Sequence, residues 1–145
     1  VDGADVTGEI RSPSVTNNVH YISNTGNVRR RMVKLQQKLA FGAHVVAEGR
    51  DMGTVVFPHA EKKFFLDANI EERAKRRYTE FKPSENEISL EAVVRDIEAR
   101  DRRDTTRSNS PLIRADDAIC MDTTKLTINE VFTAILKEID LVLKK

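Results

Sequence analysis

The sequence has little of several features that would place it in a large class of proteins. One cysteine, Cys120, excludes an intramolecular disulfide bond, which agrees with a reducing cytosolic setting. No apolar stretch approaches the roughly 20 residues that a membrane-spanning helix requires. The three histidines are scattered, without the spacing of metal ligands. We therefore expect a cytoplasmic protein with neither a membrane segment nor a metal site among its own residues.

An excess of charge of one sign is also missing. The chain has 24 Lys and Arg against 23 Asp and Glu, which gives a formal net charge of +1. Proteins that bind nucleic acid in general usually show a basic excess. Arginines nevertheless gather at residues 29–31, 73–77 and 100–107. Local arginine clusters on a balanced surface favour a small anionic ligand over nucleic acid.

Apolar periodicity predicts strands that alternate with helices, and so an α/β fold with a parallel sheet covered on both faces. Short strands and turns are expected over residues 1–18, and Cys120 is expected to be buried in the last strand. The predicted strands are 44–47, 62–66 and 118–122. The predicted helices are 28–41, 70–81, 90–103 and 128–143, with Asn27, Asn69, Ser89 and Thr127 as their caps.

The polar turn Glu48–Thr54 follows the first predicted strand, at the edge of the sheet where α/β proteins bind ligands. Its glycines let the backbone come close to a ligand. The guanidinium of Arg50 suits a phosphate, and the carboxylate of Asp51 can accept from an exocyclic amine such as that of cytosine. A structural Arg–Asp pair explains the spacing equally well.

A second cluster runs from a helix end into a loop. If the helix continues, Arg100, Arg103, Asp104 and Arg107 fall at i, i+3, i+4 and i+7 on one face. Three guanidinium groups on one face call for an anionic partner, and phosphoryl transfer depends on such charge neutralisation. The alternative is a solvated helix end with ion pairs. The 73–77 run is interpreted as an exposed helix face.

These segments, taken in order, resemble bacterial cytidylate kinases over nearly the whole chain, and the run Gly49–Pro58 is the most specific of them. The resemblance implies the P-loop NTPase fold of nucleoside-monophosphate kinases, a three-layer α/β/α arrangement that is incomplete here. The segments that carry it are Asp5–Thr7, Ile10–Pro13, Val28–Arg29, Glu48–Pro58, Phe65–Ala68, Glu72–Tyr78, Arg100–Arg107, Ser110–Leu112, Asp116–Ala118 and Asp122–Thr124.

The resemblance implies an enzyme of pyrimidine metabolism that transfers the γ-phosphoryl group of ATP to CMP or dCMP, with Mg²⁺. It places Arg29 and Asp51 at the cytosine and Arg50 near the CMP phosphate. No nucleic-acid or membrane partner is expected, and the intact enzyme is expected to be a monomer.

The remaining site residues follow from the same resemblance. Arg100 and Asp104 match positions that contact the sugar, and Arg107 matches one that helps to hold the nucleotide. Arg103 matches a lid arginine that faces the ATP phosphates, and Arg103 and Arg107 are the expected catalytic residues. His20 stands where the family commonly has a serine that touches the base, so the contact there is expected to differ.

The resemblance also divides the chain. Residues 1–27 match part of the monophosphate-binding insert, 28–79 and 109–145 the core, and 80–108 the lid. The family's Gly-rich phosphate loop belongs before residue 1, and nothing in the chain reads G-x-x-x-x-G-K-[ST]. We expect this chain on its own to be inactive and prone to self-association.

Two other interpretations remain open from the residues. One is a nucleoside-monophosphate kinase that acts on UMP or AMP, against which the amine-accepting Asp51 argues. The other is a non-catalytic nucleotide-binding or assembly module that pairs with another chain.

Overall fold

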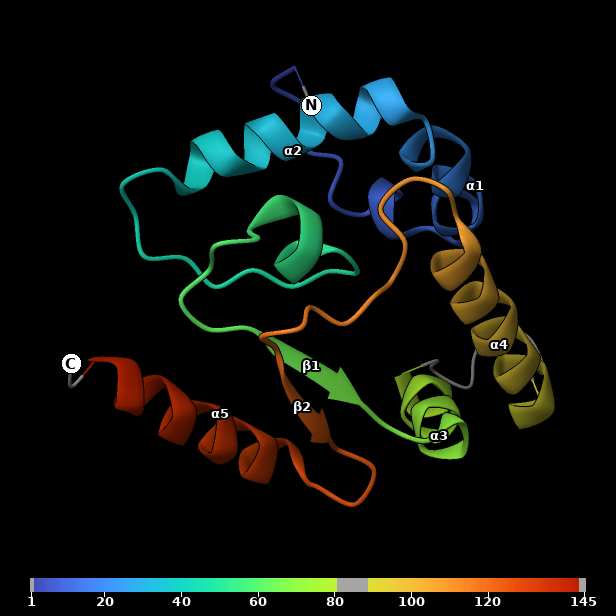
Figure 1. The fold of residues 1–145 in the computed structure, drawn as a ribbon. Helices are drawn as coiled ribbons and strands as arrows, with labels where there is room; N and C mark the ends of the chain where they lie inside the picture. Colours follow the sequence, from blue (N-terminus) through green and yellow to red (C-terminus); the bar gives the residue numbers. More distant parts are fainter. Residues whose placement is uncertain (1, 81–88, 144–145) are drawn as a thin grey trace. The chain divides into compact units, whose positions relative to one another are not determined.

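The computed structural model describes residues 2–80 and 89–143 and divides into two compact units. Unit 1 comprises Val1–Ala47 with Arg107–Asn109, and unit 2 comprises Glu48–Thr106 with Ser110–Lys145. Figure 1 shows the elements of both units, coloured along the sequence. The described sheet lies entirely in unit 2. Residues 81–88, in the predicted lid, lie outside the described residues.

Unit 1 is built from helices. Its elements are the 3-10 turn η1 (Glu9–Arg11) and the helices α1 (Pro13–Ser23) and α2 (Gly26–Ala40). The prediction of short strands and turns over residues 1–18 is therefore wrong from residue 13 onwards. The predicted helix over 28–41 is confirmed as α2, which begins two residues earlier.

The start of α1 has a local cause. Ser12 Oγ accepts a hydrogen bond from a backbone amide of the first turn at 3.3 Å, and Pro13 occupies the first helical position. A serine cap followed by proline is a typical helix start, because proline has the fixed φ of a helix and no amide to satisfy. The cap of α2 is Thr25, not the predicted Asn27.

Unit 1 has little interior of its own. Among its side chains that the structure describes, none is fully buried. The apolar stripe of α2, predicted from the 3.6-residue period, is between 37% and 73% exposed. Its members are Val28, Met32, Leu35 and Leu39. Unit 1 is therefore held mainly by helix hydrogen bonds rather than by a core.

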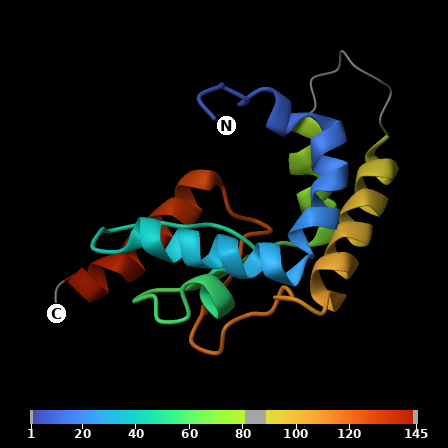
Figure 2. The same ribbon diagram turned by 90° about the horizontal axis from the view of Figure 1, so that it is seen from above.

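Unit 2 contains a two-stranded parallel sheet of β1 (Phe64–Asp67) and β2 (Ile119–Asp122), with Phe64 opposite Ile119. Its helices are α3 (Ile70–Glu80), α4 (Leu90–Thr106) and α5 (Ile128–Leu143). Figures 1 and 2 show α3 and α4 side by side. The predicted α/β fold with a parallel sheet is confirmed at this coarse level.

Three predicted helix starts in unit 2 are confirmed by their capping bonds. Asn69 Oδ1 accepts from the Glu72 amide at 2.8 Å, and Ser89 Oγ accepts from an amide in the first turn of α4 at 3.2 Å. Thr127 and Glu130 form a reciprocal capping box, in which each side chain accepts from the other residue's amide, at 3.3 and 2.8 Å. Side chains at the helix starts therefore fix where these helices begin.

The strand predicted over residues 44–47 is wrong. His44–Ala47 are irregular and exposed. A strand requires a neighbour that completes its backbone hydrogen bonds. In the described part of the chain, β1 and β2 pair only with each other.

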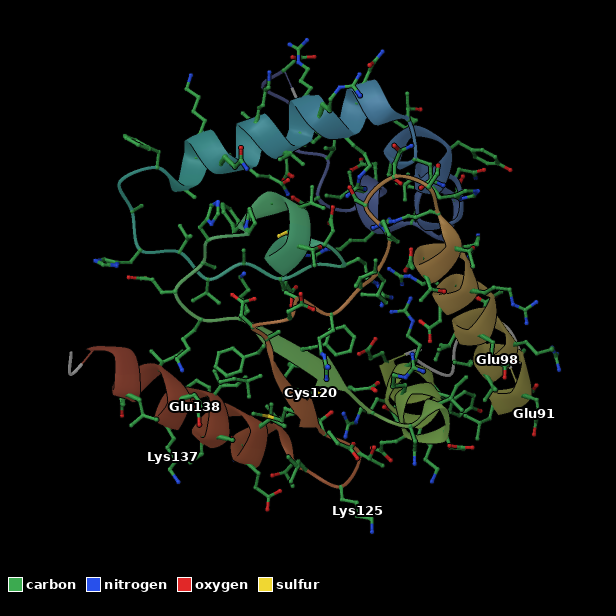
Figure 3. The ribbon with its side chains drawn as sticks, in the orientation of Figure 1. Glu91, Glu98, Cys120, Lys125, Lys137 and Glu138 are labelled. Carbon is green, nitrogen blue, oxygen red and sulfur yellow. The ribbon has the colours of Figure 1, made fainter. Side chains whose placement is uncertain are left out.

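The prediction that the sheet is covered on both faces is also wrong. Cys120, which was expected to be buried, lies on β2 and is exposed (Figure 3). Leu66 on β1 is 51% exposed, and it pairs with Met121. Because successive side chains alternate between faces, Leu66 and Cys120 lie on opposite faces. Both faces of the two-stranded sheet are therefore partly open.

The core of unit 2 is small and draws on η2, α3, α4 and the residue that follows β1. Its buried apolar residues are Val56, Ala68, Ala74 and Val93. By contrast α5 exposes large apolar side chains, with Ile128 87% and Phe132 60% exposed. None of the described helices combines the length and the apolar character needed to cross a membrane.

Candidate functional site

The turn that begins unit 2 holds Arg50 and Asp51 in a fixed frame. Its centre is a single π-helical turn, η2 (Met52–Val56). The Asp51 carbonyl accepts from two amides of this turn, at 2.9 and 3.2 Å, and the Phe57 amide donates to the Met52 carbonyl at 2.7 Å. Val56 is 1% exposed and anchors the turn in the core. The backbone that carries Arg50 and Asp51 is thus ordered by its own hydrogen bonds and by burial.

The two glycines of this turn accommodate side chains of the protein itself. A Cβ added to Gly49 would lie 2.7 Å from the end of the Met52 side chain. A Cβ added to Gly53 would lie 3.3 Å from the Lys63 side chain. These contacts show that the glycines permit close internal packing of the turn.

Arg50 reaches α4 and pairs with a carboxylate there. Its Nε lies 3.1 Å from Asp104 Oδ2, and the Nε of Arg100 lies 3.9 Å from the same oxygen. Two guanidinium groups therefore share one carboxylate, which is 17% exposed. The structure thus brings together the turn and the α4 cluster, although about 50 residues separate them in the sequence.

The electrostatics of this cluster are set by its cations. The pKa of Arg100 is lowered first by burial of its guanidinium and then by the positive charge of Arg50, while Asp104 acts in the opposite direction. A guanidinium still keeps its proton at neutral pH. After burial, the neighbouring charge of Arg50 is the next cause, and an anion placed beside the two guanidinium groups would oppose it.

A pocket of about 310 Å³ opens beside this cluster, between α3 and α4. Five arginines and two carboxylates contribute to its wall, so its charge is positive. The lining residues are Arg50, Arg73, Arg76, Arg77, Glu80, Ile97, Arg100 and Asp101. The pocket suits an anion that carries several negative oxygens, because arginine binds phosphate through paired N–H donors.

Three of these arginines belong to the 73–77 run, which was interpreted as an exposed helix face. Arg73 and Arg76 are only partly exposed, and with Arg77 they fall at i, i+3 and i+4, on one side of α3. The same spacing argument that singled out the 100–107 cluster could have found them. What the sequence did not show is that α4 packs against that side.

Two of the α3 arginines are held by the fold. Arg73 Nη1 donates to Asp101 at 2.5 Å and its Nε to the Ala68 carbonyl at 3.0 Å. Arg76 pairs with Glu72 on its own helix and donates to the Thr123 carbonyl at 2.7 Å. Their guanidinium planes are therefore oriented before any ligand arrives.

The helix predicted over residues 90–103 is confirmed as α4 and runs three residues further than predicted. α4 ends at Thr106, and Arg107 is grouped with unit 1. The carbonyl of Asp104, which a longer helix would pair with residue 108, accepts from the Leu112 amide at 2.7 Å. The helix stops there, so the face that a continued helix would give includes Arg100, Arg103 and Asp104 but not Arg107. Arg103 remains on α4, where it is exposed and does not line the pocket.

The remaining candidate residues lie in unit 1. Arg29, on α2, donates from Nη1 to the Ser23 carbonyl at 3.3 Å. His20 lies in the last turn of α1, with its ring centre 4.1 Å from that of Tyr21. These contacts describe local packing, and the roles predicted for His20, Arg29 and Arg107 stay predictions.

Comparison of the sequence with known proteins shows the family of this chain. The model of the cytidylate kinase family matches residues 1–141. The chain belongs to the cytidylate kinase family. Cytidylate kinases of Enterococcus faecalis, Halalkalibacterium halodurans and Desulforamulus reducens are 50%, 48% and 46% identical to it over 135, 136 and 136 residues. These alignments cover 93%, 94% and 94% of this chain but only 60%, 61% and 61% of the relatives. The chain thus spans about three fifths of the length of these cytidylate kinases.

Proposed function

We propose that the protein to which this chain belongs transfers the γ-phosphoryl group of ATP to CMP or dCMP, giving CDP or dCDP and ADP. The observation that carries the proposal is the arginine-lined pocket of unit 2, which includes Arg50 from the Gly49–Pro58 turn and Arg100 from α4. Membership of the cytidylate kinase family supports the same reaction.

The pocket suits phosphoryl transfer because this reaction depends on positioning and charge neutralisation. An oxygen of the CMP phosphate attacks the γ-phosphorus, the bond to the β-phosphate oxygen breaks, and ADP leaves. Negative charge is spread over the equatorial oxygens of the transferring group and develops on the leaving oxygen as the bond breaks. Arg73 and Arg76, held by the fold, would offer guanidinium groups that need no reorganisation, and Arg50 would hold the phosphate of the acceptor.

Recognition of the acceptor is proposed to use residues of unit 2. In unit 2, Asp51 accepts from the cytosine amine, and Arg100 and Asp104 contact the sugar. The Arg50–Asp104 contact at 3.1 Å supports a shared role for the turn and α4. Asp51 is 5% exposed, so a base that reaches it leaves water and meets a carboxylate in a poorly solvated setting.

The predicted roles of the remaining candidates are part of the proposal. Arg29 and His20 are assigned to the base, Arg107 to the nucleotide, and Arg103 to the ATP phosphates during transfer. The exposed position of Arg103 on α4 leaves its guanidinium accessible to a ligand.

Mg²⁺ accompanies ATP in the proposed reaction, but no residue of this chain is assigned to it. Among residues 2–80 and 89–143, no group of three or more His, Cys, Asp and Glu side chains is arranged to hold a metal ion. The residues of this chain that supply positive charge to the reaction are its arginines.

The decisive experiment is a coupled ADP-release assay on the whole protein with CMP, dCMP, UMP and AMP as acceptors. We expect CMP and dCMP to be used far better than UMP, and AMP hardly at all. A strong preference for AMP would overturn the proposal. Calorimetric titration of this chain with CMP and with ATP tests the division of roles, and CMP binding without ATP binding is expected.

A further inference from the structure

Lys63 connects the start of β1 to the turn that carries Arg50 and Asp51. Its side chain is only 7% exposed. Its Nζ donates to the Pro58 carbonyl at 2.6 Å, directly beyond the π-helical turn. A buried ammonium group therefore fixes the far end of the turn.

The aliphatic part of Lys63 also packs against the middle of the turn. A Cβ on Gly53 would lie 3.3 Å from Lys63 Cδ and 3.7 Å from the Ala115 side chain, so no larger residue fits there without a shift. The Lys63 backbone is fixed as well, because its carbonyl accepts from the Ile119 amide at 2.9 Å. Lys63 thus contacts the turn at its middle and its end, from a position tied to β2.

Asp117 supplies the counter-charge for this buried cation. Its two carboxylate oxygens lie 2.9 and 2.8 Å from Lys63 Nζ. With the Pro58 carbonyl they give three acceptors for the three N–H donors of the ammonium. A buried charge without its partner is strongly unfavourable, so Asp117 holds the Lys63 ammonium beside the Pro58 carbonyl.

We propose that Lys63 is a positioning residue for the turn that carries Arg50 and Asp51, and that Asp117 holds Lys63 in place. The inference rests on the proposed role of Arg50 and Asp51 in binding CMP. Lys63 acts through the turn. Without the Lys63 ammonium, the Pro58 carbonyl at the end of the turn loses its hydrogen-bond donor. The backbone that carries Arg50 and Asp51 is then no longer held in one conformation.

The test compares two adjacent lysines in the whole protein. Lys63→Met keeps most of the buried stem and removes the charge. Lys62→Met is the matched control, because Lys62 pairs with Glu138 of α5 at 3.5 Å and has no described contact with the turn. We expect Lys63→Met to weaken CMP binding about tenfold or more, since small displacements of binding groups have effects of this order. Lys62→Met should leave it unchanged.

A second measurement separates positioning from general stability. Hydrogen exchange of the Val55, Val56 and Phe57 amides, whose acceptors lie within the turn, should accelerate at least tenfold in Lys63→Met, while exchange in α5 stays as in the control. Equal exchange of the three amides in the two variants would overturn the proposal, and so would equal acceleration throughout unit 2. If the unmodified protein does not bind CMP, the proposed function fails, but the exchange comparison still decides whether Lys63 holds the turn.

Asp117→Asn provides an independent variant if Lys63→Met does not fold. It should accelerate exchange at the same three amides and weaken CMP binding in the same direction. Adding Asp117→Asn to Lys63→Met should cause little further loss, because Asp117 acts through Lys63. Fully additive losses would show that Asp117 has a separate role and would contradict its part of the proposal.

Discussion

Units 1 and 2 differ in how their candidate residues are held, that is, in the burial and ion pairing around them. Unit 2 has four buried apolar side chains, and ion pairs between α3, α4 and the turn orient Arg50 and Arg73. In unit 1, none of the described side chains around His20 and Arg29 is fully buried. The difference indicates that unit 2 presents a site whose geometry exists before the ligand binds, whereas unit 1 contributes side chains on helices held by local bonds.

The largest effect is expected from the pocket itself. Arg100→Ala should weaken CMP binding by about 10- to 100-fold, because loss of a hydrogen bond from a charged group costs about 1.5–3 kcal/mol. Arg95→Ala, on the exposed side of the same helix, is the control and should change nothing. Calorimetry measures both. An equal loss from Arg29→Ala would remove the contrast between the units.

The next effect concerns the packing of α3, the helix that carries three of the pocket's arginines. Ala74 is 0% exposed, so Ala74→Leu should overpack unit 2 and lower its free energy of unfolding by about 1–3 kcal/mol. Lys75→Leu places the same side chain at the exposed neighbouring position and should have little effect. Thermal unfolding compares them. In unit 1, Leu35→Ala is expected to cost far less than a core substitution, and a comparable loss would show that the α2 stripe is buried in solution.

Helix caps give a smaller and closely matched comparison. Thr127→Ala removes half of the capping box of α5 and should cost about 1 kcal/mol. Thr25→Ala, at the start of α2, should cost much less because the Thr25 side chain makes no capping hydrogen bond. Denaturant unfolding of the two variants is the measurement. Equal losses would contradict the view that a side chain caps α5 but not α2.

The smallest effect is an acid dependence. The hydrogen bond from Lys63 lowers the pKa of Asp117 below its ordinary value of 3.8. Because the folded pKa is the lower one, the pair stabilises the fold fully above the unfolded pKa, and this contribution is lost as pH falls through the folded value. Unfolding midpoints measured between about pH 5 and pH 2 should fall less steeply in Asp117→Asn. An unchanged slope would show that the pair contributes nothing to acid stability.

Local signals in the sequence predicted the helix starts well. Asn69, Ser89 and Thr127 cap helices because their side chains satisfy amides within three residues, which is a purely local cause. The parallel pairing of β1 and β2 also followed from the alternation of strands and helices. The start of α1 was equally local, at Ser12 and Pro13, and was missed.

Features that depend on distant contacts could not be predicted. The end of α4 depends on the Leu112 amide, which donates to the Asp104 carbonyl eight positions earlier in the chain. The exposure of Cys120 depends on the absence of a layer over its face of the described sheet. The pocket depends on α4 packing against one side of α3. The spacing of Arg73, Arg76 and Arg77 alone therefore does not show that they line a pocket.

The two-stranded sheet has a consequence for the behaviour of this chain in concentrated solution. In the described part of the molecule, β1 and β2 each pair along one side only, so each strand offers an open row of backbone donors and acceptors on the other. Open edges of this kind act as templates for extended segments of other molecules. Because Leu66 on β1 is exposed, strand addition between copies would bury apolar surface as well. The particle size of the isolated chain should therefore rise with concentration.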